Sequence, residues 1–234
     1  MSFLASQGIK ALCLDIDGTL YSKRMLNWRM FRSSFPSLRL GLYFNAVRKE
    51  YREVQEIEPT IPASRKGLLA RQASLVLKRY GMQDTPANQA KIAKRIDKQF
   101  YKAWERSFLS IKPHAKMREA LVMARQEGMV IAVFSDFPLA DKLKTLGIDD
   151  LVDIALSAED SGYLKPSKKA FAYLLDHVQV QPNEILYVGD SYSKDCKGSK
   201  QSGMYSCLLS SSKKVYTDAD LVVGSWKEFI SLVL

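Results

Sequence analysis

The segment Ile9–Thr19, IKALCLDIDGT, joins an apolar run to two carboxylates and a glycine. Apolar residues follow one another almost without interruption in residues 8–17, which predicts a strand covered on both faces, as in a parallel sheet. Asp15 and Asp17 come where this strand ends, and a turn at Gly18 can bring both carboxylates around one small volume. Two carboxylates so close repel each other unless one is protonated or a cation lies between them. Taken alone, the segment fits a solvated turn after a strand equally well.

This apolar run is the first of six, and helical patterns separate the later ones. Pro166 and Ser225 stand where helices are expected to begin, and Gly128, Gly147 and Gly203 follow expected helix ends. Strands that alternate with helices predict a three-layer, Rossmann-like α/β fold with a parallel sheet. The later runs are Met129–Phe134, Val152–Leu156, Glu184–Val188, Tyr205–Leu209 and the weaker Leu221–Val223.

Residues 21–108 interrupt the alternation with helical patterns alone. Apolar residues recur there at intervals of three and four, without a convincing strand, and Pro59 and Pro62 bracket an expected turn. We therefore expect residues 1–20 and 109–234 to form an α/β core, and residues 21–108 to form an all-helical domain inserted after the first strand. The helical patterns run through Leu40–Val54, Leu68–Tyr80 and Ile92–Trp104.

Length and composition exclude several classes of protein. The chain has 234 residues, 47% hydrophobic and 26% charged, so it is long enough for one core with an insert and too apolar for a disordered protein. Its apolar runs are too short to span a bilayer, and we expect no secretory leader. Cys13, Cys196 and Cys207 show no metal-ligand spacing, which favours a reduced, cytoplasmic protein without a disulfide-linked partner.

The net charge of +10 is concentrated in the insert. Residues 21–108 contain 19 Lys and Arg against 7 Asp and Glu, whereas the remainder contains 16 against 18. A basic surface suits phosphorylated small molecules, nucleic acid or an anionic membrane. Residues 24–52 also interleave aromatic residues with Arg and Lys, a pattern that can bind nucleic acid or lipid. We expect instead that these aromatics form the core of the insert and that the basic side chains face water.

Further polar residues follow the later apolar runs. Ser135 and Asp136 end the second run, Lys165 precedes a helix, and Asp190 ends another run, with Asp195 five residues further on. Taken alone, Ser135, Lys165 and Asp195 each fit a helix cap or a solvated side chain better than a site, whereas Asp190 at a strand end is harder to explain in that way. Together they follow the carboxyl ends of successive parallel strands, where side chains converge. Clustered acids favour Mg²⁺, and Mg²⁺ with a lysine and a hydroxyl can neutralise a phosphoryl group during transfer.

Four segments, in chain order, resemble the motifs of the haloacid dehalogenase-like (HAD) hydrolase superfamily. They are LDIDGTL, IAVFSD, GYLKPS and VGDSYSKD, and they span Leu14 to Asp195. The resemblance implies the same α/β core, and it implies that the helical insert between the first two motifs is a C1 cap. Such caps close over the site, exclude water and contact the substrate.

The resemblance also implies catalytic roles. Asp15 would be the nucleophile that attacks phosphorus, and Asp17 would be the general acid and base. Lys165 would offset the negative charge of Asp15 and of the phosphoryl group. Members that act as dehalogenases lack an acid at the position of Asp17, so its presence here favours phosphate esters.

Binding roles follow in the same way. Ser135 would hold a phosphate oxygen, and Gly18, Thr19 and Asp136 belong to the same phosphate-binding loops. Asp136 stands where many relatives have Asn, which places another negative charge near the site. The implied Mg²⁺ ligands are Asp15, the backbone carbonyl of Asp17, Asp190 and, directly or through water, Asp195.

The function predicted from these observations is a Mg²⁺-dependent phosphatase. It would hydrolyse a small phosphorylated metabolite, such as a nucleoside monophosphate or a sugar phosphate, through an aspartyl-phosphate. A phosphomutase of the same superfamily shares every motif and stays open. A non-catalytic protein that binds nucleic acid or anionic membrane through its basic insert is less favoured, because the set of catalytic residues is intact.

Overall fold

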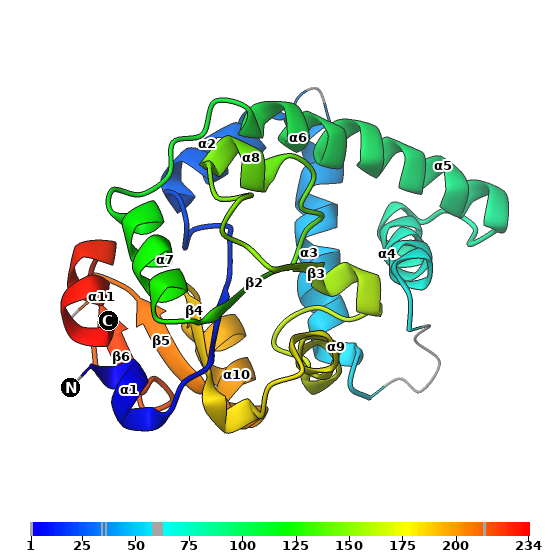
Figure 1. The fold of residues 1–234 in the computed structure, drawn as a ribbon. Helices are drawn as coiled ribbons and strands as arrows, with labels where there is room; N and C mark the ends of the chain where they lie inside the picture. Colours follow the sequence, from blue (N-terminus) through cyan, green and yellow to red (C-terminus); the bar gives the residue numbers. More distant parts are fainter. Residues whose placement is uncertain (1, 34, 36, 58–62, 213) are drawn as a thin grey trace.

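The central feature of the computed structural model is one parallel sheet of six strands, in the order β3-β2-β1-β4-β5-β6 (Figure 1). The structure describes residues 2–33, 35, 37–57, 63–212 and 214–234. The predicted fold class is therefore confirmed. The strands are β1 (Ala11–Leu14), β2 (Val130–Ser135), β3 (Ile154–Ser157), β4 (Ile185–Gly189), β5 (Tyr205–Leu209) and β6 (Leu221–Val223).

The order of the strands places β1 where the path of the chain reverses. From β1 the chain builds β2 and β3 on one side, then crosses to β4, β5 and β6 on the other. Leu14 pairs with Val133 of β2 and with Val188 of β4, so the residues that follow β1 and β4 emerge at the same edge. In open α/β sheets, this edge beside the reversal point is where ligands bind.

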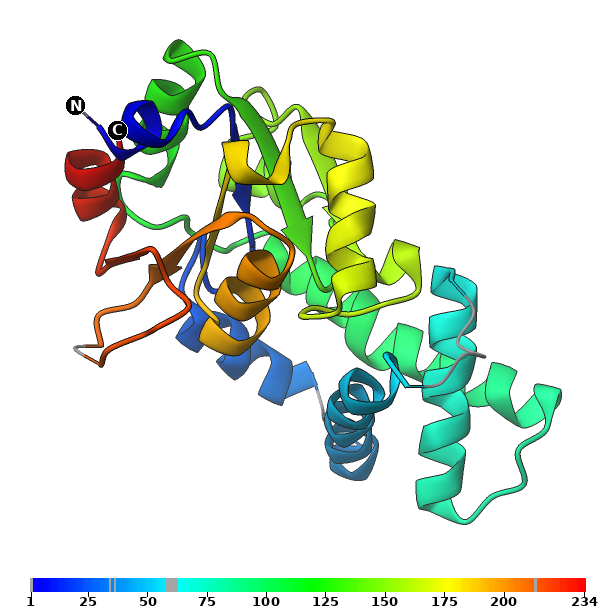
Figure 2. The same ribbon diagram turned by 90° about the horizontal axis from the view of Figure 1, so that it is seen from below.

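Helices cover both faces of the sheet. Helices α1, α7 and α11 lie on one face, and α9 and α10 lie on the other (Figure 2). The two ends of the chain lie close together (Figure 1). The helices are α1 (Phe3–Gln7), α7 (Met117–Gln126), α8 (Lys142–Leu146), α9 (Lys168–Val178), α10 (Lys197–Gln201) and α11 (Trp226–Val233), with short helical turns η2 (Ala158–Ser161), η3 (Pro182–Glu184) and η4 (Tyr192–Cys196).

Most predicted limits of the core elements agree with the structure to within a few residues. The first strand is shorter than expected, because α1 ends at Gly8, which has a positive φ, and pairing begins only at Ala11. Pro113 could have begun the next helix, but it forms an antiparallel bridge with Tyr21, and α7 begins only at Met117. The expected cap of the last helix is present, since the Ser225 side chain accepts from the Glu228 N–H.

Between β1 and β2 the described residues form helices, as predicted. These helices lie together beyond the carboxyl ends of the strands (Figure 2). Ser64 caps the helix that begins at Arg65, and Gly81, which has a positive φ, ends it. Thr85 caps the helix that begins at Pro86. Pro59 and Pro62 lie outside the described residues. The elements are α2 (Lys23–Ser33), α3 (Leu38–Val54), α4 (Arg65–Tyr80), α5 (Pro86–Ile96), the π-helical turn η1 (Asp97–Tyr101) and α6 (Lys102–Phe108).

The expectation that the aromatics of residues 24–52 form the core of the insert is only partly right. Phe44 and Tyr51 are buried, and Phe44 stacks on Phe100 with ring centroids 5.1 Å apart. The side chains of Trp28 and Phe31 are instead exposed, at 61% and 53%. No helix in the described ranges is long and apolar enough to cross a membrane.

Candidate active site

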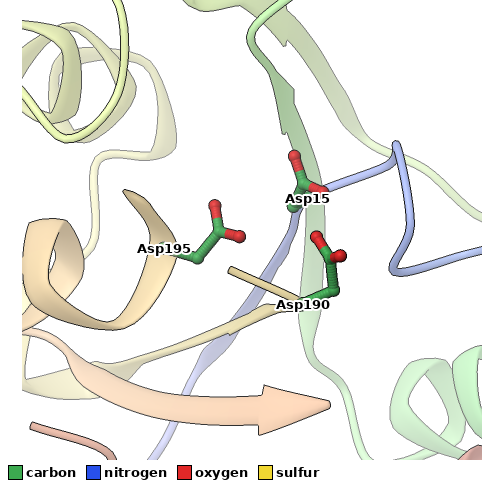
Figure 3. Close-up of side chains that lie close together, drawn as sticks. All are labelled: Asp15, Asp190 and Asp195. Atoms are coloured by element: carbon green, nitrogen blue, oxygen red, sulfur yellow. The ribbon is translucent and has the colours of Figure 1, made fainter. Parts of the chain in front are cut away.

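Three aspartates gather at the carboxyl edge of the sheet. Asp15 follows β1, Asp190 follows β4, and Asp195 lies in η4 (Figure 3). One carboxylate oxygen from each lies within 4.8 Å of the others. Among the described residues, Oδ1 of Asp190 is buried without a hydrogen-bond partner. A hard cation such as Mg²⁺ fits this set, because it binds carboxylate oxygens and would satisfy the orphaned atom.

Two glycines allow the three carboxylates to approach each other. Gly18 has a φ of +111°, and a Cβ there would lie 2.6 Å from Oδ2 of Asp190. A Cβ on Gly189 would lie 2.3 Å from the Cβ of Asp195. Both distances are shorter than atoms tolerate, so a larger residue at either position would push an aspartate out of the cluster.

Lys165 is fully buried and joins two of the aspartates. Its Nζ donates to Asp15 Oδ1 at 2.6 Å, to Asp195 Oδ1 at 2.7 Å, and to the Tyr187 hydroxyl at 2.9 Å. Burial opposes its charge, yet the two carboxylates raise the pKa of Lys165 well above its ordinary value. Burial also raises the pKa of Asp15 to about 6, although Lys165 counteracts part of that effect. The ion pair with Lys165 therefore favours the ionised form of Asp15 against the effect of burial.

Asp17 turns away from this cluster. It accepts hydrogen bonds from Ser135 Oγ at 3.0 Å, from Lys142 Nζ at 2.8 and 3.1 Å, and from the Tyr21 hydroxyl. Burial opposes its charge, but Lys142 outweighs this and lowers the pKa of Asp17. The two carboxylates of the Asp15-x-Asp17 motif thus occupy different environments, one beside the acidic cluster and one beside a lysine.

Lys142 and Tyr21 were not predicted from the sequence. Lys142 is buried at the start of α8, with its Nζ 4.3 Å from the centre of the Phe108 ring. Since most lysines are solvated, a single Lys after the second motif carries no sequence signal. Tyr21 follows the first motif directly, and only its position in the sequence could have suggested a contact with Asp17.

A pocket lies beside Asp17, between the end of the sheet and the inserted helices. Its lining is mostly apolar and aromatic, and Glu105 and Lys142 are the charged residues in it besides Asp17. The other lining residues are Met30, Tyr101, Trp104, Phe108, Phe137 and Pro138.

Thr19 and Asp136, both predicted to lie in phosphate-binding loops, have protein partners for their side chains. Thr19 Oγ1 donates to Asp15 Oδ2 at 3.1 Å. Asp136 Oδ1 accepts from the Lys165 N–H at 3.0 Å, and Oδ2 pairs with Arg52 at 2.8 Å. Burial opposes the charge of Asp136, but Arg52 and other cations hold its pKa well below its usual range. In this structure Asp136 therefore orients the loop that carries Lys165.

Helix α3 of the insert binds the same loop through its side chains. Arg52 Nε donates to the Lys165 carbonyl at 3.0 Å. Gln55 donates to the Leu164 carbonyl at 2.9 Å and accepts from the Leu164 N–H at 2.8 Å. Together with Asp136, these side chains satisfy every backbone hydrogen-bonding group of Leu164 and Lys165. Arg52 and Gln55 are more than 100 positions from the loop in sequence, so local patterns gave no sign of the contact.

A buried ion pair lies next to these contacts. Arg48 of α3 pairs with Glu159 of η2, and both side chains are almost fully buried. The Tyr101 hydroxyl donates to the same carboxylate oxygen at 2.7 Å. A buried charge left without its partner is strongly destabilising. The pair therefore fixes α3 against the core at the place where the Lys165 loop begins.

Near the aspartate cluster, one basic residue of the insert reaches the site. Lys23 Nζ lies 2.6 Å from Oδ2 of Asp190 and remains largely exposed. The nearby Arg29 instead donates to the carbonyl of Ser107 and to Ser110. Lys23 therefore offsets part of the negative charge of the aspartate cluster.

The sequence profile of the haloacid dehalogenase-like hydrolases matches residues 9–203. This range covers most of the chain and includes the four motifs. The chain belongs to this family, and it is a hydrolase.

Two curated relatives match over most of their length. The haloacid dehalogenase-like hydrolase domain-containing protein 3 of Mus musculus is 32% identical over 173 residues, which cover 72% of this chain and 67% of the relative. A glyceraldehyde 3-phosphate phosphatase of Methanopyrus kandleri is 28% identical over 201 residues, which cover 84% of this chain and 82% of the relative.

Solved structures with the same fold include members of different activity. The L-2-haloacid dehalogenase of Xanthobacter autotrophicus superposes with a TM-score of 0.62 at 16% identity, over 96% of this chain and 98% of the other. The HAD-hydrolase YfnB of Bacillus subtilis gives a TM-score of 0.64 at 16% identity, over 96% and 98%. At this identity the likeness establishes the fold alone.

Proposed function

We propose that this protein is a Mg²⁺-dependent phosphatase that hydrolyses a small phosphorylated metabolite through an aspartyl-phosphate. The observation that carries the proposal is the separation of Asp15 from Asp17. Asp15 lies with Lys165 at the acidic cluster, and Asp17 lies with Lys142 beside a mostly apolar pocket. Two carboxylates in different environments suit a nucleophile and a proton-transfer group, respectively.

The proposed reaction has two steps. In the first, Asp17, whose pKa is lowered by Lys142, must first take up a proton from solvent; a carboxylate oxygen of Asp15 then attacks phosphorus, the bond to the ester oxygen breaks, and that oxygen takes the proton from Asp17. In the second, Asp17 accepts a proton from water as that water attacks phosphorus and releases Asp15. Lys165 offsets the negative charge, and Ser135 orients Asp17 through its hydrogen bond. Asp15, Asp190 and Asp195 would hold Mg²⁺, which supplies positive charge beside the phosphoryl group.

The relatives support a phosphatase rather than a dehalogenase. Besides the protein from Methanopyrus kandleri, relatives in Methanocaldococcus jannaschii and Pyrococcus furiosus are glyceraldehyde 3-phosphate phosphatases. Another, in Halopiger xanaduensis, is a ribulose-1,5-bisphosphate 5-phosphatase. Asp17, an acid that dehalogenases of the family lack, agrees with this assignment. We infer a small phosphate ester, hydrolysed in the cytoplasm, with residues 21–108 acting as a cap over the site.

The test is phosphate release from a panel of esters that includes glyceraldehyde 3-phosphate, sugar phosphates and nucleoside monophosphates. We expect release with Mg²⁺, none with EDTA, and a loss of at least about 10³-fold in Asp15→Asn, because the nucleophile is removed. Asp149→Asn, the same substitution at an exposed residue, is the matched control and should keep full activity. Hydrolysis by Asp15→Asn at the wild-type rate would refute the mechanism. Transfer of phosphate to a sugar hydroxyl instead of water would identify a phosphomutase.

A further inference from the structure

An exposed apolar strip runs along α2 and the start of α3 in the insert. We call it the aromatic–basic surface. Monomeric proteins seldom expose so many large apolar side chains side by side, and such patches mark interaction sites. Its apolar members are Trp28, Phe31, Phe35, Leu38 and Leu42, which are 61%, 53%, 56%, 43% and 69% exposed. Its basic members are Arg24, Arg32 and Arg39, all exposed.

The strip is continuous from α2 to α3. Arg24, Trp28, Phe31 and Arg32 recur at intervals of three and four, so they share one face of α2. The ring of Trp28 stacks on that of Phe31 with centroids 6.3 Å apart, and Phe31 meets Phe35 edge-on at 5.6 Å. The rings therefore form a ridge of contacting aromatics rather than isolated exposed residues.

A groove between α2 and α3 borders this ridge. Its rim includes the exposed side chains of Phe31, Leu38 and Leu42. Its floor is formed by buried or partly buried residues of the insert, namely Met30, Phe44, Phe100 and Trp104. The aromatic ridge and the groove together form an uneven apolar surface into which flexible hydrocarbon chains can fit.

The charge of this region has one sign. From Tyr21 to Lys49 the chain has seven Lys and Arg and no Asp or Glu. In the described part of the chain, neither Arg24 nor Arg32 forms an ion pair with a carboxylate. Arg39 lies over the rings of Tyr43 and Tyr80, at 5.3 and 5.0 Å from their centres, which keeps its charge at the surface. The partner of this surface must therefore offer negative charge as well as apolar material.

We propose that the aromatic–basic surface docks on an anionic lipid bilayer. Trp and Phe beside Arg suit the boundary between headgroups and acyl chains, and Arg binds lipid phosphates. A second copy of the chain, packed face to face, would bring two positive surfaces together. Nucleic acid would satisfy the arginines and could stack on the rings, but Leu38 and Leu42 offer no plane for a base.

Binding can be read from the intrinsic fluorescence of the protein. Trp28 is exposed, whereas Trp104 and Trp226, the other two tryptophans, are buried. Vesicles that contain phosphatidylserine and phosphatidylcholine should shift the emission to shorter wavelengths and sediment the protein, whereas pure phosphatidylcholine vesicles should do neither. High salt should weaken the binding, because it screens the arginines. In Trp28→Phe the shift should disappear.

Matched variants locate the contact. We expect Leu42→Ser combined with Arg32→Gln to weaken partitioning into anionic vesicles about tenfold or more, since each basic residue near such a surface contributes about 1 kcal/mol, or fivefold. Leu232→Ser, at a comparably exposed leucine of α11, should bind like the wild type. Thermal melting of each variant checks that it is folded.

Several results would overturn the proposal. These are the absence of binding to anionic vesicles, equal binding to neutral vesicles, and a dimer in solution whose disruption by Leu42→Ser exposes Trp28. Binding of an RNA oligonucleotide that shifts the Trp28 emission, without any response to vesicles, would assign the surface to nucleic acid instead. None of these measurements depends on hydrolysis of a phosphate ester.

Discussion

At the scale of single residues, the pairing of Asp17 with Lys142 sets the pH dependence of the proposed chemistry. Lys142 lowers the pKa of Asp17, which burial alone would raise. In Lys142→Met the pKa of Asp17 should therefore rise, and the limb of the kcat/KM profile that belongs to Asp17 should move to higher pH. Lys142→Arg keeps the charge and should leave the limb near its wild-type position. An unchanged profile in Lys142→Met would show that Asp17 does not titrate in the rate-limiting step.

Asp136 gives a second prediction at this scale, for stability. Arg52 lowers the pKa of Asp136 in the folded protein. The ionised carboxylate therefore stabilises the fold at any pH above the pKa of this Asp in the unfolded chain, which is about 4. Asp136→Asn should lower the free energy of unfolding by about 2 kcal/mol at pH 7, because it removes a charged hydrogen bond. The difference should shrink as the pH falls below about 4, where Asp136 of the unfolded chain takes up protons. Urea unfolding at pH 7 and pH 3.5 measures both values.

The sequence revealed site residues where the signal was local. Asp15, Asp17 and Asp190 follow apolar strands directly, and parallel strands carry such residues to one edge. Lys142 and Arg52 could not be predicted, because each reaches its partner only through the packing of a helix. The direction of the Asp136 side chain could not be predicted either, because the motif gives only its position in the sequence, whereas its partner Arg52 belongs to the insert.

At the scale of elements, α3 is part of the frame of the site. Gln55→Leu should lower the free energy of unfolding by about 1–3 kcal/mol, because it leaves the buried N–H of Leu164 without a partner, whereas the Leu164 carbonyl keeps its bond from the Ser167 N–H. Leu164 precedes Lys165, which contacts the nucleophile Asp15. Gln55→Leu should therefore also lower kcat by a larger factor than it raises KM. Lys49→Ala, on the exposed side of the same helix, should change stability by less than about 0.5 kcal/mol.

The elements themselves were largely predictable, and the departures have local causes. The cap at Ser225 was predicted, because a serine side chain can bond the first turn of a helix. The helical pattern Ile92–Trp104 includes the π-helical turn η1, because apolar spacing over five residues does not distinguish a π-helix from an α-helix; η4 is a second such turn. Asp195 lies in one of these turns and accepts from the Ser191 N–H, while also pairing with Lys165.

At the scale of the whole molecule, metal binding should stabilise the fold. The acidic cluster collects Asp15, Asp190 and Asp195 around one point. A cation bound only to the folded state at 100 times its Kd adds about 2.7 kcal/mol, which for a chain of this size raises Tm by roughly 5–10 °C. Mg²⁺ should therefore raise Tm of the wild type and of Asp149→Asn. It should do so much less in Asp190→Asn, and an equal rise there would place the ion elsewhere.

The count of charged residues predicted that the insert is basic and the core is not. It did not predict which side chains the insert exposes. Composition showed that residues 21–108 carry the entire basic excess. It could not show that Trp28 and Phe31 face outward, because helical periodicity identifies the faces of a helix without telling which one is covered. That choice depends on the packing of α2 against α6, which no local pattern encodes.

The bridge between Tyr21 and Pro113 has an evolutionary consequence. It joins the chain as it leaves the sheet to the chain as it returns, and the His114 N–H donates to the Leu20 carbonyl beside it at 2.9 Å. A segment whose two ends meet can be lengthened, shortened or exchanged by recombination without a shift in strand register. Descendants of such a gene can therefore explore new substrate preferences in the helices, while the sheet and its carboxylates are inherited unchanged.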